Sequence, residues 1–398
     1  MTPVAISRAT LTTAVGAGNA AHLAGLQACR TGLAPCSFAD VRLPGYVGEV
    51  AGVDAVRLPE ALADFDCRNN RLAWLGLQQD GFAADVMAAC ERWGARRVAV
   101  VLGSSTSGIL QTELAYQRRG ADGALPADFR HEQTHDTGSV AGFVARALGL
   151  RGPGWVVSTA CSSGAKVFAA GARLIATGLA DAVVVGGVDS LCLTTLHGFN
   201  SLELFAPDIC RPWDARRTGL SLGEGAAFAL LERQCHAPQG WLLGTGESSD
   251  GYHMSSPHPE GAGAVAAMRE ALASAGLRPE QIDYINLHGT GTPSNDAVED
   301  RAVVSVLGEA TPCSSTKGAT GHTLGAAGAV EAAISLLALR AQLMPAGLNV
   351  NEPDPGLRAN YLTRNRSAPL RTVLSNSFGF GGSNASLVLG VPVPCRLM

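Results

Sequence analysis

One of the ten cysteines in the sequence lies in a pattern that suits covalent catalysis. Cys161 lies in residues 157–164 (VSTACSSG), between an apolar run typical of a strand and an alanine-rich run typical of a helix. Backbone N–H groups at a helix start favour a thiolate, and small neighbours leave the sulfur accessible. The N–H of Cys161 could also bind a substrate carbonyl oxygen at such a turn. The pattern favours a nucleophile over a buried structural cysteine, and a cysteine protease stays an alternative.

His288 follows directly after a predicted strand, and the loop behind it contains Gly289, Thr290, Gly291 and Thr292. Such a loop is suited to hydrogen bonding with an extended polar ligand. A single histidine at a strand end is more often structural than catalytic, so this segment needs support from elsewhere.

A second histidine, His322, lies in the glycine-rich residues 315–328, five positions after Lys317. The glycines around it leave its ring free to approach a substrate. Glu331 lies on the following predicted helix, where it either faces solvent or pairs with Lys317. Two histidines in such segments, together with one candidate cysteine, indicate a single catalytic site.

The segment 376–384 (NSFGFGGSN) places Phe380 among three glycines. This pattern predicts a lid, because glycine hinges let the ring swing while the backbone N–H stays near a site. The alternative is a plain glycine-rich turn before a last strand at 387–389.

The elements that must position these residues alternate between strand-like and helix-like runs, as in an α/β protein. The modules 156–177 and 312–342 each place glycines and a reactive residue at a loop-to-helix junction. They predict two pseudo-repeated halves, residues 1–235 and 236–398. The strand–helix–strand run at 154–186 should be parallel and right-handed. Further strands are expected at 97–103, 223–232 and 281–287, and further helices at 261–276 and 327–342.

The composition sets limits on function. A chain of 398 residues with 46% hydrophobic and 16% charged residues can bury a large core. The net charge of −4, without any Lys/Arg-rich stretch, argues against a nucleic-acid partner. The apolar runs are of strand length, well short of the ~20 residues that span a bilayer. Cysteines without CxxC pairs fit a reducing compartment, so we expect a cytoplasmic protein without a membrane partner.

The four segments, taken together and in this order, resemble those of the elongating β-ketoacyl-acyl-carrier-protein synthases, condensing enzymes of the thiolase fold. They read TACSS, LHGTGT, KGxxGHxxGAAG and NSFGFGGSN. The resemblance runs over most of the chain and includes RPWD at 211–214, GEGA at 223–226 and SDGYHM at 249–254. It implies an α/β, thiolase-like fold in which two pseudo-repeated halves form a layered αβαβα core.

The resemblance also implies the roles of the reactive residues. Cys161 would be the nucleophile, His288 and His322 the histidine pair, and Lys317 the cation that supports them. The backbone N–H groups of Cys161 and Phe380 would form the oxyanion hole, with Phe380 as the gate.

Five further positions match residues that serve the same site in the family. Thr290 and Thr292 match threonines that contact the pantetheine arm. Asp296, Glu299 and Glu331 match positions that order the site. No metal and no organic cofactor is implied, because the substrates are carried on the phosphopantetheine of acyl carrier protein.

The activity implied is the decarboxylative Claisen condensation of a Cys161-bound acyl group with malonyl-acyl carrier protein, in fatty-acid or polyene/polyketide biosynthesis. A malonyl-carrier decarboxylase or an acyltransferase of the same fold is an alternative. A non-catalytic chain-length-determining subunit is another, but the presence of Cys161, His288, His322 and Lys317 argues against it.

The implied partners are an acyl carrier protein and a second subunit, either a copy of this chain or a homologue like a chain-length factor. A basic patch for the acidic carrier protein could comprise Arg68, Arg71, Arg211, Arg216 and Arg217, although each could equally be a solvated surface charge.

Three finer features bear on the second subunit and the acyl group. The family pairs the strand before its nucleophile across a two-fold axis, and residues 154–159 are suitably apolar. Residues 191–193 and 165–167 are similar to synthases of aryl-polyene-type pathways, which often pair with a chain-length-factor-like subunit. Thr106 falls where the family sets the bottom of its acyl pocket.

Overall fold

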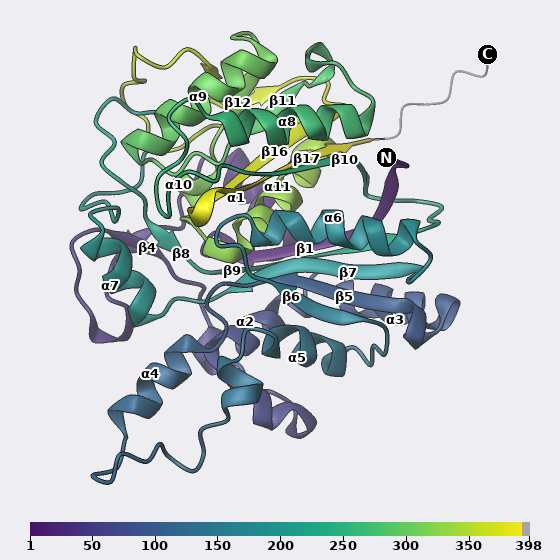
Figure 1. Ribbon diagram of the computed structural model, residues 1–398, viewed down its shortest axis with the longest axis vertical. Helices are drawn as coiled ribbons and strands as arrows, with labels where there is room; N and C mark the ends of the chain where they lie inside the picture. The colour runs from purple at the N-terminus through teal and green to yellow at the C-terminus, as the bar shows by residue number, and fades with distance from the viewer. Residues whose placement is uncertain (392–398) are drawn as a thin grey trace.

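The computed structural model describes residues 1–391 (Figure 1), and the structural statements below refer to these residues. Hydrogen bonds within this part of the chain link a 12-stranded mixed sheet. Its order is β14 (Asn360–Tyr361), β12 (Pro312–Ser314), β11 (Tyr284–Asn286), β16 (Thr372–Gly379), β17 (Ser383–Gly390), β10 (Gly240–Ser249), β1 (Val4–Thr13), β9 (Gly225–Glu232), β7 (Ala182–Asp189), β5 (Val98–Gly103) and β6 (Gly154–Val157), with β2 (Gly16–Ala17) beside the end of β1.

The sheet consists of two groups of strands that meet where β1 pairs with β10. This antiparallel pairing covers only three residues of β1, Val4 to Ile6. In the first group, β6 and β7 both pair parallel to β5, which confirms the predicted parallel arrangement around the cysteine module. In the second group, β12 and β16 both pair parallel to β11. The same local arrangement therefore occurs once in each group.

Two helices lie between the groups of strands, and others cover the outside. α6 (Ser163–Ala176) and α11 (Ala327–Ala341) pack against strands of both groups and against each other. One outer layer contains α8 (Ala262–Ala275) and α9 (Pro293–Leu307), and the other contains α2 (Arg68–Leu77), α3 (Phe82–Trp93) and α5 (Ser139–Ala147) (Figure 1). The predicted layered αβαβα core is confirmed. The division into residues 1–235 and 236–398 stays a prediction.

The remaining elements lie at the edges of the layers. They are α1 (Gly18–Gln27), α4 (Ile109–Gln117), α7 (Leu193–Ser201), α10 (Lys317–Thr320), the small sheet β3 (Ala34–Pro35), β4 (Tyr46–Gly48) and β8 (Leu222–Gly223), and the pair β13 (Leu343–Met344) and β15 (Arg366–Ser367).

The apolar character of the central elements explains their position. Every residue of β5, β7 and β9 is buried, as expected for strands covered by helices on both faces. Residues Leu324–Ala341, which include α11, are long and apolar enough to cross a bilayer, but 89% of that window is buried inside the fold. The hydrophobicity of α11 therefore serves the central layer.

The central helices α6 and α11 touch backbone to backbone near their first turns. A Cβ atom added to Gly164 would lie 2.8 Å from the backbone nitrogen of Ala329, and one added to Gly328 would lie 2.5 Å from the backbone nitrogen of Ala165. Real Cβ atoms essentially never approach closer than 3.0 Å. Only glycine fits at these two positions, and the contact joins the segment after Cys161 to the segment after His322.

We predict that Gly328→Ala destabilises the protein by about 1–3 kcal/mol, because the added methyl group meets backbone of the neighbouring helix that cannot move aside. Thermal unfolding measures the change. Gly198→Ala is the matched control: this helical glycine has no atom within 4 Å of an added Cβ, so stability should stay unchanged or rise by up to about 1 kcal/mol. Equal melting temperatures for Gly328→Ala and the wild type would contradict the contact.

Candidate active site

Cys161 lies in a sharp turn between β6 and α6. Ala160, the residue before it, adopts φ 51°, a left-handed conformation that costs energy for a residue with a side chain. The hydroxyl of Ser163 holds the turn, because it accepts from the N–H of Thr159 and donates to the carbonyl of Ala160. The turn thus presents the sulfur at the start of α6, as the sequence predicts.

The environment of Cys161 keeps its sulfur protonated. Burial raises the pKa of the Cys161 thiol to about 11, against the opposing effects of the Lys317 ammonium and the backbone N–H of Phe380. Desolvation of the sulfur outweighs these favourable partners, and the effect of the helix start on the thiolate stays a prediction. The thiol needs a base within reach when it reacts.

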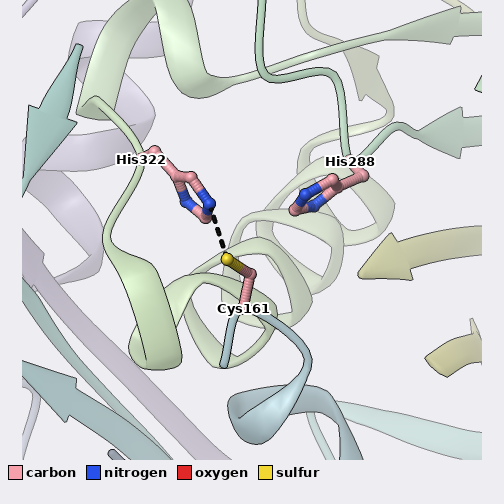
Figure 2. Close-up of side chains that lie close together, drawn as sticks. All are labelled: Cys161, His288 and His322. Carbon is pink, nitrogen blue, oxygen red and sulfur yellow. Dashed lines mark hydrogen bonds between the residues drawn. The ribbon is translucent and has the colours of Figure 1, made fainter. Parts of the chain in front are cut away.

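His322 lies within hydrogen-bond distance of this thiol. Its Nε2 lies 3.0 Å from Sγ of Cys161 (Figure 2). Backbone bonds hold the residue against β8, since His322 N donates to Ser221 O and Gly223 N donates to His322 O. Burial, followed by the charge of Lys317, lowers the pKa of His322 well below its usual value, so the ring is neutral and can accept a proton. Its Nδ1 has no hydrogen-bond partner within the described residues, which leaves its tautomer free to change.

His288 lies on the other side of the sulfur, just after β11. Its ring is nearly perpendicular to that of His322, with ring centroids 5.4 Å apart (Figure 2). Glu299 holds its backbone, because the two carboxylate oxygens accept from the N–H groups of His288 and Gly289 at 2.8 and 2.7 Å. Burial, followed by the charges of Lys317 and His322, lowers the pKa of His288 well below its usual value. This imidazole is also neutral.

Lys317 lies behind His288, fully buried and paired with Glu331. Its ammonium also donates to the backbone oxygen of His288 and lies 3.4 Å from Nδ1 of the ring. Because an ammonium can only donate, this contact favours the tautomer with the hydrogen on Nε2 of His288. Burial raises the pKa of Glu331 to about 7, against the opposing effect of Lys317. Lys317 thus contacts His288 and Glu331 pairs with Lys317, and the supporting role that the resemblance implies for both residues stays a prediction.

Phe380 lies in the turn of the hairpin between β16 and β17, so the predicted lid is a three-residue turn, Phe380–Gly382. Its backbone N–H faces the sulfur of Cys161. Its ring stacks on that of Phe199, with centroids 5.7 Å apart and 24° between the planes. The sequence analysis missed Phe199, whose helix carries no motif, and only its place in the fold reveals the contact.

A cleft reaches Cys161, and Phe199, Phe380, Thr290 and Thr292 line it. The hydroxyls of Thr290 and Thr292 lie 2.9 Å apart, so they form a polar pair on its wall.

Asp296 lies behind the threonine loop and does not line the cleft. Its carboxylate accepts from the N–H groups of Trp213 and Gly291 and lies 3.5 Å from the guanidinium of Arg217. Burial raises the pKa of Asp296, against these partners. Asp296 therefore orders the loop that carries the threonines.

The structure corrects the prediction for Arg68. This residue is only 6% exposed, and its guanidinium binds Glu224, Asp54 and Glu49. A buried side chain with all its donors occupied cannot meet a carrier protein, so the prediction is wrong for Arg68. Its charge instead neutralises the fully buried Glu224.

The other four arginines are paired or exposed to different degrees. Arg71 binds Asp66, and Arg211 binds Asp208. Arg217 is buried and binds Asp354, whereas the side chain of Arg216 is 62% exposed. Of these arginines, Arg216 is the most available to a partner.

Three donor atoms could in principle hold a metal ion. Those of Cys161, His288 and His322 all lie within 4.8 Å of one another, and they form the one such group of three in the described residues. The Lys317 ammonium directly behind His288 disfavours a second cation at this position.

The surroundings of the imidazoles distinguish a cysteine protease from a thiol enzyme that transfers acyl groups. A cysteine protease places an amide or carboxylate behind its histidine. Within the described residues, the group at Nδ1 of His288 is a lysine, and Nδ1 of His322 has no partner. Two neutral imidazoles instead face one sulfur, and both line the cleft. The fold and the site define an acyl-transferring thiol enzyme of the thiolase-like class.

Comparisons with known proteins agree with this class of enzyme. The N-terminal and C-terminal domains of β-ketoacyl synthase match residues 70–237 and 240–351. The 3-oxoacyl-[acyl-carrier-protein] synthase 2 of Coxiella burnetii is 34% identical over 85% of this chain and 84% of its own length. Nodulation protein E of Rhizobium sp. (strain N33) is 36% identical over 75% of this chain and 77% of its own length.

Among solved structures, the ketosynthase ApeO in complex with its chain length factor ApeC from Xenorhabdus doucetiae is similar over 98% of each chain, with a TM-score of 0.89 and 38% identity. The chain belongs to the β-ketoacyl synthase family and is an acyltransferase.

We predict that alkylation of Cys161 by iodoacetamide accelerates about tenfold per pH unit between pH 7 and 10, because only the thiolate reacts and its pKa is raised to about 11. Intact-mass measurement follows the modification, and Cys161→Ala reports alkylation of other cysteines. A rate that levels off near neutral pH would show a stable thiolate and contradict this environment.

Proposed function

We propose that this enzyme joins a Cys161-bound acyl group to malonyl-acyl carrier protein by decarboxylative Claisen condensation. The observation that carries the proposal is that two neutral imidazoles and a backbone N–H converge on one buried thiol. The same group of hydrogen-bond donors can then stabilise negative charge in both half-reactions, first as the acyl intermediate forms and then on the enolate.

The first half-reaction moves the acyl group to the enzyme. His322 accepts the proton of the Cys161 thiol at Nε2, and the sulfur attacks the thioester carbonyl. The N–H groups of Cys161 and Phe380 stabilise the resulting oxyanion. The proton then passes to the leaving pantetheine thiolate, so the products are acyl-Cys161 and the free carrier thiol.

The second half-reaction begins with malonyl carrier in the same cleft. Loss of CO₂ places negative charge on the thioester oxygen, where the Nε2–H groups of His288 and His322 can donate. A donor of this kind is typically worth about 2.7–4 kcal/mol of barrier. Lys317 favours the required tautomer of His288, and His322 can adopt it because its Nδ1 is not committed.

Bond formation completes the cycle. The enolate carbon attacks the acyl-Cys161 carbonyl, the C–S bond breaks, and the β-ketoacyl group leaves on the carrier. The Cys161 thiolate takes up one proton from solvent, which restores the thiol.

The cleft is consistent with substrates on a phosphopantetheine arm. Such an arm is long, narrow and polar, and the hydroxyl pair of Thr290 and Thr292 offers it hydrogen bonds on the way to Cys161. The arm is part of the substrate, and this chemistry uses no resident metal or organic cofactor. We infer that the partner is an acyl carrier protein and that the enzyme acts in the cytoplasm.

A second thiolase-fold subunit is the other partner that we propose. β6 pairs on one side with β5 and is the end of the sheet within the described residues. Trp155 on this strand and Leu179 nearby expose large apolar side chains. Both the Xenorhabdus relative and the ishigamide ketosynthase, which is 28% identical, were solved with a chain length factor. Pairing through β6 supplies hydrogen bonds to its free edge.

Intact-mass measurement after incubation with acyl carrier protein tests the first half-reaction. We expect one acyl group on the wild type and none on Cys161→Ala, because the acyl group needs this sulfur. Cys192→Ser, which changes another buried cysteine, should acylate like the wild type. Persistent acylation of Cys161→Ala would refute the assignment.

Release of CO₂ from malonyl carrier tests the histidine pair. We expect His288→Ala to acylate at the wild-type rate but to release CO₂ about 10²–10³-fold more slowly, because it loses one enolate donor while the hydrogen bond between His322 and the thiol remains. His131→Ala, at an exposed position, is the control. Unchanged CO₂ release by His288→Ala would rule out its role.

A further inference from the structure

A buried carboxylate outside the histidine and cysteine motifs connects the two sides of the site. Asp189 is the last residue of β7 and has no solvent exposure. It accepts from the hydroxyls of Ser104, Ser105 and Thr106 and from the backbone N–H groups of Ser105, Thr106 and Gly325. No cation pairs with it in the described residues, so neutral donors alone compensate its charge.

The donors come from two different parts of the active site. Residues 104–106 follow β5, beside the start of α6, where Gly103 lies against the backbone of Ser163 and Gly164. Gly325 lies three residues after His322, in the turn that leads into α11. Its N–H donates to Asp189 at 2.6 Å and also lies 3.3 Å from the hydroxyl of Ser105.

We propose that Asp189 is a positioning residue that sets the distance between His322 and Cys161 by holding the turn after His322 against the loop beside α6. The chemistry of the donors supports this role. Three of them are backbone N–H groups, which cannot turn around to accept, so an asparagine amide would direct its NH₂ group at donors. Only a carboxylate satisfies all of them. The inference rests on the proposed function of His322 and extends it to a residue that touches no substrate.

The charge of Asp189 also has an effect on the pKa of the Cys161 thiol that can be measured. The carboxylate lies close enough to Cys161 to help raise the pKa of its thiol, although burial is the largest cause. This property reports whether the charge lies near the sulfur, and it is independent of the effect of Asp189 on CO₂ release.

A double-mutant cycle on CO₂ release from malonyl carrier tests the proposal. In the wild-type background, Asp189→Asn should lower the rate by about 10- to 100-fold with little change in KM, because His322 is displaced but the cleft is intact. In the His322→Ala background the same change should cost less than about twofold, because the histidine that Asp189 positions is gone. Equal costs in the two backgrounds would overturn the proposal.

Two comparisons keep this result interpretable. Glu224→Gln changes another buried carboxylate of the same half, which binds Arg68 and lies outside the site. Its effect on the rate should be the same in both backgrounds. Ser105→Ala is a milder change that removes one hydrogen-bond donor to Asp189, and it replaces Asp189→Asn in the test if Asp189→Asn folds poorly. It should lower the rate of CO₂ release by a smaller factor than Asp189→Asn. No effect of Ser105→Ala on the rate would contradict the network.

Alkylation of Cys161 separates this inference from the proposed function, because it needs neither carrier protein nor condensation. Asp189→Asn should shift the pH profile of alkylation to lower pH, since a negative charge near the sulfur is removed. An unshifted profile would overturn the placement of Asp189. If His322→Ala alone left CO₂ release intact, the proposed function would fail, while the alkylation result would still stand.

Discussion

The close contact between α6 and α11 is the constraint on which the site depends. Cys161 precedes one helix and His322 precedes the other, and the two helices are distant in the sequence. Gly164 and Gly328 let their backbones touch, and this brings Nε2 of His322 to 3.0 Å from the sulfur. A side chain at either glycine would push the two halves of the site apart. The pseudo-repeated fold therefore has a chemical consequence, because each half supplies one member of the central pair.

Burial determines the protonation states of the residues that the fold brings together in the site. Desolvation keeps the thiol of Cys161 protonated and both imidazoles neutral. The same groups can then transfer a proton in one half-reaction and donate hydrogen bonds in the other. The only buried lysine, in the described residues, lies behind His288 and is paired with Glu331, so its charge orients a ring without leaving an unpaired cation.

The sequence was sufficient for the fold class, the main elements and the residues around the thiol, because these depend on local patterns. Cys161 and His288 each lie where a strand meets a loop, and α11 is apolar along most of its length. Interactions between distant segments could not be predicted in this way. The raised pKa of Cys161 comes from burial by the whole fold, and Arg68 is buried because Glu224, 156 residues away, needs a partner. Asp189 had a signal, a charged residue that ends an apolar run, but its partners at 104–106 and 325 are distant in sequence.

The central claim is that one thiol both carries the acyl group and is the electrophilic site of carbon–carbon bond formation. A single-turnover experiment tests it most directly: enzyme loaded with an isotopically labelled acyl group is mixed with malonyl carrier, and the label is followed by mass spectrometry. The account predicts that the label leaves Cys161 and appears in β-ketoacyl carrier, with one CO₂ released per label. Release of CO₂ while the label stays on Cys161, or is lost as free acid, would contradict it.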